Sequence, residues 1–180
     1  MWWLQDNGFK QSDIKIALSC TMTAMSESTD VFKRNYLVVG LSEEQLATVF
    51  GLATVSRMSG GEQLLRIGAE GTHLYVIING RANVLTADGD KLAEVGPGNV
   101  LGEISLIDAR PSGADAFCVG PTTVAALPTK ELRKLMASNK ELGFTVLANL
   151  SRVLCMRLRD ANSKIDVLMD QVGDTWNNAL

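Results

Sequence analysis

Histidine and cysteine are scarce in this 180-residue sequence, which has one histidine, His73, and three cysteines, Cys20, Cys118 and Cys155. A single histidine excludes a multi-histidine metal site. Because it lies in a glycine-containing turn, we expect it to be solvent-exposed rather than part of a catalytic triad. The cysteines are too widely spaced for a zinc knuckle or a redox motif, which indicates reduced thiols and a cytoplasmic protein. We therefore predict no metal, no catalytic residue and no enzymatic activity.

Positive charge and long apolar runs are also lacking. The formal net charge is −3, whereas nonspecific binding to nucleic acid needs clustered lysine and arginine. No apolar run approaches the roughly 20 residues that cross a bilayer. With 46% hydrophobic and 21% charged residues, the composition is that of an ordinary globular domain. We expect neither a nucleic-acid partner nor a membrane span.

The middle of the chain has the pattern of a β-rich domain. Ser42 and Gln45 form a capping box that predicts a short helix before it. Between Thr54 and Leu127, short runs rich in branched residues are separated by glycine-containing turns, and Asp88-Gly89 is a strong hairpin signal. Seven or eight strands at this spacing indicate a barrel, roll or sandwich. The predicted strands include 63–67, 74–79, 82–86, 91–95 and 122–127.

The pattern changes to helix after Pro128. Thr129 begins one helix, and Ser138–Glu141 reads as a second capping box that opens a long one. The long helix carries a coiled-coil-like seam. We expect its first half to cover the β domain and the part beyond Arg159 to pack on a partner helix, most simply from a second copy. The seam residues are Leu147, Leu150, Leu154, Leu158, Ala161, Ile165, Leu168 and Val172.

Two segments carry a resemblance to a known family. The stretch from Leu64 to Val84 and the stretch from Gly96 to Asp108 resemble, in order, the glycine turns and the start of the phosphate-binding cassette of cyclic-nucleotide-binding domains. The resemblance covers about residues 37–160. It implies an α+β, mainly β fold: an eight-stranded β-roll or jelly roll with an N-terminal helix and a C-terminal helix pair.

The resemblance also suggests a division of the chain. Residues 1–36 form an N-terminal extension in which we expect short helices, residues 37–160 the cyclic-nucleotide-binding-like domain, and residues 161–180 a C-terminal helix extension. Only about eight residues follow Val172, too few for the helix pair of a DNA reader, so no DNA-binding domain is expected.

The resemblance assigns a ligand site to the cassette. In the family a glutamate, here Glu103, accepts a hydrogen bond from the ribose 2′-hydroxyl, and an arginine pairs with the phosphate. This chain has Ser112 at that position, directly after Pro111, while Arg110 is expected to point outward. The candidate ligand-binding residues are Gly102, Glu103, Ile104, Ser105, Ser112, Gly113 and Ala114; Asp115 is either a ligand contact or a strand-edge charge.

The missing arginine sets the expected affinity. Losing a charge-assisted partner for a desolvated phosphate costs about 3–4 kcal/mol, which weakens binding a few hundredfold. A stand-alone regulatory or sensor domain is therefore expected, binding cyclic AMP or cyclic GMP weakly or not at all. The alternative is a ligand-free interaction module that acts on a protein partner through a homodimer formed by the C-terminal helix.

Overall fold

The computed structural model describes residues 30–33 and 35–177. Residues 30–33 are helical. The elements that follow are η1 (Tyr36–Val38), α2 (Glu43–Gly51), β1 (Thr54–Met58), β2 (Gln63–Leu65), β3 (His73–Asn79), β4 (Ala82–Leu85), β5 (Lys91–Val95), β6 (Val100–Leu101), α3 (Glu103–Asp108), β7 (Asp115–Cys118), β8 (Thr122–Pro128), α4 (Thr129–Ser138) and α5 (Lys140–Asn177).

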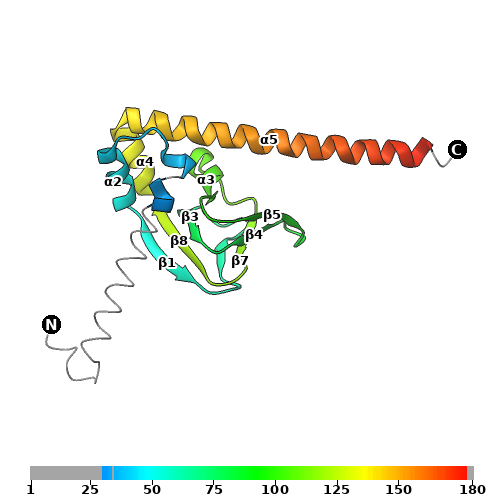
Figure 1. Cartoon of the computed structure of the whole chain (residues 1–180), viewed down its shortest axis with the longest axis horizontal. Helices are drawn as coiled ribbons and strands as arrows, with labels where there is room; N and C mark the ends of the chain where they lie inside the picture. The colour runs from blue at the N-terminus through cyan, green and yellow to red at the C-terminus, as the bar shows by residue number, and fades with distance from the viewer. Residues whose placement is uncertain (1–29, 34, 178–180) are drawn as a thin grey trace, which may run out of the picture.

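The eight strands form two antiparallel four-stranded sheets, in the orders β1-β8-β3-β6 and β2-β7-β4-β5. One hydrophobic core lies between the sheets and includes Ile77, Ala116 and Val124. A second core joins the first sheet to the helices through residues such as Leu74, Leu127 and Leu142. The predicted β-roll with a preceding helix and a following helix pair is therefore confirmed, and Figure 1 shows α2 and α4 beside each other at one end of the roll.

Local sequence signals explain most of the element boundaries. Ser42 and Gln45 form the predicted capping box at the start of α2. The Asp88-Gly89 turn joins β4 to β5, with Gly89 at a φ of 87° that favours glycine. The predicted capping box at Ser138 is wrong, because Ser138 is the last residue of α4 and its hydroxyl donates to the carbonyl of Leu135. The side chain of Asn139 instead accepts from the amide of Leu142 at the start of α5.

Helix α5 has 38 residues and is about 57 Å long, at 1.5 Å per residue. Its first part packs on the domain through Leu142, Val146 and Leu150, which are fully buried. Figure 1 shows that the helix then runs on past the roll, and every side chain from Leu158 to Val167 is exposed. No helix within the described residues is both long and apolar enough to cross a membrane.

The predicted seam does not cover the domain in its first half. Leu147 is 43% exposed and Leu158 is 62% exposed, so only Leu150 of the early seam residues is fully buried in the domain core. The reason is geometric: the mean direction of the seam lies about 80° around the helix from that of the residues that face the domain, at 100° per residue, and the two sets share only Leu150. The exposed seam therefore begins over the domain rather than after Arg159. The side chains of Leu168 and Val172 lie outside the described residues.

Candidate functional site

The predicted cassette forms a loop, the short helix α3 and a second loop that leads to β7. Gly102 precedes α3 with φ +85°, and a Cβ at this position would lie 2.8 Å from the carbonyl oxygen of His73. At Gly71 a Cβ would lie 2.3 Å from the Cβ of Ser105. Both glycines are therefore needed for the close packing of α3 on the start of β3, independently of any ligand.

Glu103, the first residue of α3, is buried and already has a charged partner. Its side chain is 4% exposed and forms an ion pair with Arg157 of α5. Arg157 also donates through Nη2 to the carbonyl of Val100 at 3.3 Å. The carboxylate that was expected to accept from a ribose hydroxyl is thus engaged by a residue 54 positions later in the chain.

Tyr36 of η1 completes this buried group. Its hydroxyl oxygen is enclosed and makes no hydrogen bond of ordinary geometry with any described residue. Burial raises the pKa of Tyr36 strongly, the charge of Glu103 raises it further, and Arg157 and the backbone of Val100 act in the opposite direction. Residues 36, 103 and 157 therefore bring three separate segments, η1, α3 and α5, to one polar cluster, which we call the Glu103 cluster.

Two other arginines in or beside the cassette have no contact with Glu103. Arg133 of α4 donates to the carbonyls of Leu106 and Ser105, which are near the C-terminal end of α3. Arg110 is exposed, as predicted, and its backbone amide donates to the Asp108 carboxylate at 2.9 Å. Ile104 is exposed, while Ser105 is buried.

The second loop of the cassette is tied to the β2–β3 loop through backbone hydrogen bonds. The amide of Ser112 donates to the carbonyl of Ala69, and the amide of Gly68 donates to the carbonyl of Ser112, both at 2.9 Å. The Ser112 hydroxyl donates to the carbonyl of Ala114 at 2.8 Å. Gly113 is exposed and Ala114 is half-buried. This loop keeps an ordered conformation but supplies no positive charge.

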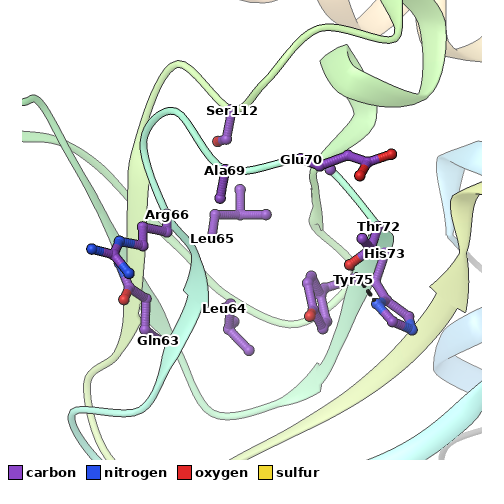
Figure 2. Close-up of a pocket in the computed structure, with 11 residues that line it drawn as sticks. Gln63, Leu64, Leu65, Arg66, Ala69, Glu70, Thr72, His73, Tyr75 and Ser112 are labelled. Atoms are coloured by element: carbon purple, nitrogen blue, oxygen red, sulfur yellow. Dashed lines mark hydrogen bonds between the residues drawn. The ribbon is translucent and has the colours of Figure 1, made fainter.

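A cavity of about 220 Å³ lies between this loop, β2 and the start of β3. Figure 2 shows Ser112 and Ala69 on one side of it and Leu64 and Tyr75 on the other. Of the predicted site residues, only Ser112 lines the cavity; Glu103 does not. His73, expected to be exposed, is half-buried because it starts β3, and its Nδ1 lies 3.0 Å from the Thr72 hydroxyl. The cavity is below the roughly 300–1,000 Å³ of most small-molecule pockets.

The sequence left open whether Asp115 contacts a ligand or is a strand-edge charge, and in the structure it makes two hydrogen bonds. Its Oδ1 accepts from the Ile67 amide at 2.8 Å and from the Gln63 side chain at 3.0 Å, which fastens β7 to β2. Within the described residues, no three histidine, cysteine, aspartate or glutamate side chains gather in a metal-binding group. Cys118 is buried and Cys155 exposed, both as free thiols, and Cys20 lies outside the described residues.

Sequence reasoning missed Arg157 and Tyr36 as members of the site. A signal for Arg157 was present: it follows Val146, Leu150 and Val153 at steps of four, three and four, which places it on the domain-facing side of α5. A charged residue that continues an apolar stripe requires a buried partner. Tyr36 had no comparable signal, because its segment lacks periodicity.

The comparisons with known proteins agree with this architecture. Residues 56–139 match the family model of the cyclic nucleotide-binding domain. The chain is 28% identical over 132 residues to glutaminase 2 of Bradyrhizobium diazoefficiens, covering 73% of this chain and 21% of that protein. It therefore spans about a fifth of the length of this relative.

Two solved structures show the same fold at similar identity. A cyclic nucleotide-binding domain from Methylobacillus flagellatus has a TM-score of 0.68 and 28% identity, covering 79% of this chain and 83% of that one. The catabolite activator protein of Thermus thermophilus has a TM-score of 0.63 and 28% identity, covering 74% and 63%. The β-roll and its helices therefore have the fold of a cyclic nucleotide-binding domain, and residues 56–139 match the model of that family.

Proposed function

We propose that this chain is a regulatory domain that binds cyclic AMP and cyclic GMP more weakly than about 100 μM and acts as a dimer through α5. The observation that carries the first part is the lack of a positive charge at position 112. Ser112 stands where the family's phosphate partner belongs, and its hydroxyl is used by the Ala114 carbonyl. Glu103 is buried in an ion pair with Arg157, so a ligand has to compete for its carboxylate.

The size of the cavity beside Ser112 supports the same proposal. At about 220 Å³ it is smaller than most ligand pockets, and it does not reach Glu103. A nucleotide that contacted both cassette loops would have to displace side chains. This reorganisation reduces the net binding free energy further.

The dimer proposal rests on a second apolar stripe on α5. Phe144, Leu147, Leu158, Ile165 and Met169 are all exposed, at 43–76%. At 100° per residue they lie within about 60° of the helix circumference, and they extend over about 37 Å. Such a stripe suits a helix with the same pattern, which a second copy supplies. The described elements leave it uncovered along its whole length.

Calorimetric titration tests the ligand part of the proposal. We expect dissociation constants above about 100 μM for both cyclic nucleotides, because the phosphate lacks a charge-assisted partner at position 112. A low-micromolar constant would overturn this reading of Ser112. For the dimer, sedimentation of a chain truncated after Arg159, which removes Ile165 and Met169, should show a monomer; continued dimerisation would remove the argument from the stripe.

A second candidate is a ligand-free interaction module. It is favoured by the occupation of Glu103, because Arg157 already fixes α5 on the cassette without a nucleotide. The same titration separates the two. If up to about 10 mM nucleotide causes no heat and no chemical-shift change, the ligand-free module is the remaining candidate. Such a module would act through protein contacts made by α5.

A further inference from the structure

The Glu103 cluster contains hydrogen-bonding groups that the fold does not use. A guanidinium has five N–H donors, and Arg157 uses two of them, one to Glu103 and one to Val100. The Arg157 side chain is 39% exposed, in contrast to its partner at 4%, so part of it is accessible from the solvent. The enclosed hydroxyl of Tyr36 is a further unpaired group in the same place.

The charges around Glu103 restrict how an anion can approach this cluster. A phosphate that approaches Glu103 meets a carboxylate, and like charges repel unless a cation neutralises one of them. Among the described arginines of the cassette, Arg133 is bound to carbonyls of α3 and Arg110 is exposed on the loop. Arg157 alone of these three touches the glutamate.

We propose that Arg157 of α5 is the phosphate-binding residue of this domain, in place of the arginine that position 112 lacks. One face of its guanidinium holds Glu103, and the free N–H groups bind the phosphate of a cyclic nucleotide whose hydroxyl is presented to the carboxylate. This inference rests on the proposed weak binding of cyclic nucleotides. In this arrangement the residue that binds the phosphate lies on α5 rather than on the cassette loop.

The test is an NMR titration of cyclic AMP and cyclic GMP into the full chain, with inorganic phosphate as a third probe. Arg157→Ala should weaken nucleotide binding by about tenfold to a hundredfold, the range of one charge-assisted hydrogen bond. Arg159→Ala is the matched control, because it removes the same charge two residues along α5 at an exposed position. Both Arg159→Ala and Arg110→Ala should leave the dissociation constant within about twofold of the starting protein.

Arg157→Ala also leaves a buried carboxylate unpaired, so a second pair of variants keeps the test independent of folding. Glu103→Gln removes the carboxylate charge and retains Arg157, and it should bind inorganic phosphate at least as well as the starting protein, although a nucleotide loses the carboxylate that accepts from its hydroxyl. Arg157→Ala with Glu103→Gln removes both charges and should lose binding relative to Glu103→Gln alone.

The outcomes are distinct. Nucleotide binding that persists in the double variant, or that disappears in Arg110→Ala, overturns the role of Arg157 while leaving the proposed function intact. Loss of inorganic phosphate binding in Glu103→Gln equal to that in Arg157→Ala shows that the ion pair, not the cation, is needed, and also overturns it. Absence of any binding by the starting protein up to about 10 mM overturns the ligand part of the proposed function and this inference together.

Discussion

The exposed stripe of α5 gives a quantitative prediction for the double variant Leu158→Asp/Ile165→Asp. Leu158 is 62% exposed and Ile165 is 56% exposed, and neither contacts the domain core. Complete burial of such a side chain contributes about 1.5–3 kcal/mol, so burial of the exposed part contributes about 1–2 kcal/mol. A symmetric dimer buries each residue twice, and the two substitutions therefore remove about 4–7 kcal/mol of association free energy.

At 1.4 kcal/mol for each factor of ten, the dimer dissociation constant should rise by about a thousandfold to a hundred-thousandfold. Sedimentation equilibrium measures this directly. We expect a dimer for the starting chain at about 50 μM and a monomer for the double variant. Thermal unfolding of the variant monomer should change little, because both positions are outside the two cores.

The matched control uses the other side of the same helix. Met156 and Val167 are 56% and 55% exposed, similar to the tested pair, and lie about 160° around the helix from Leu158 and Ile165. Met156→Asp/Val167→Asp makes the same change from apolar to acidic, yet it should leave the dimer intact. Dissociation caused by the control pair, or a dimer that survives the tested pair, would refute the assignment of the interface to the stripe.

Three further predictions follow from the cassette and its surroundings. Ser112→Arg should lower the dissociation constant for cyclic AMP by about a hundredfold, because the adjoining cavity has room for a longer side chain. Ser112→Gln, which adds length without charge, should give no gain. If calorimetry shows no gain for arginine, the cause of the weak binding lies beyond position 112. Gly102→Ala should lower the free energy of unfolding by more than the strain of about 1–3 kcal/mol that a positive φ imposes, since its Cβ would also meet the His73 carbonyl. Gly61→Ala, at φ +84° with open space around it, should cost only the strain. Equal losses of the two variants in urea unfolding would show that the contact with His73 has no energetic effect. The raised pKa of Tyr36 means that the folded protein favours the neutral phenol. The free energy of unfolding should therefore not change with the ionisation of Tyr36 below about pH 10, and above it should fall by up to about 1.4 kcal/mol per pH unit. If a Tyr36→Phe variant shows the same alkaline slope, Tyr36 is not its source.

The parts of the fold that could be predicted depend on contacts between near neighbours in the sequence. The Ser42 capping box joins residues three apart, and the Asp88-Gly89 turn joins strands that are consecutive in the chain. In both cases all the interacting residues lie within one short segment of the sequence. The prediction failed at Ser138, where two helices meet. A serine at this position can either begin a capping box for α5 or end α4, and the sequence fits both. Which of the two forms depends on how α4 packs on α5.

The candidate site was less predictable because its decisive contacts are long-range. The sequence shows Ser112 directly after Pro111, where the resemblance implies an arginine, and it also predicted that Arg110 is exposed. The pairing of Glu103 with Arg157 was not, since it joins residues 54 apart and depends on the rotation of α5 about its axis. The same rotation decides which apolar stripe faces the domain, and the seam was misassigned for this reason.

Arg157 and Leu158 are consecutive residues of one continuous helix, so the cassette contact and the exposed stripe are mechanically joined. A rotation of α5 that releases Glu103 must also change the direction of Leu158. A ligand shifts such an equilibrium only by the difference between its affinities for the two helix positions. With a dissociation constant near 100 μM, a nucleotide at about 10 mM shifts the equilibrium by at most about 2.7 kcal/mol, even if it binds only one of the two helix positions. This shift is smaller than the roughly 4–7 kcal/mol carried by Leu158 and Ile165, so a weak ligand at the Glu103 cluster can weaken the association of two chains by up to about a hundredfold for each bound nucleotide but cannot abolish it.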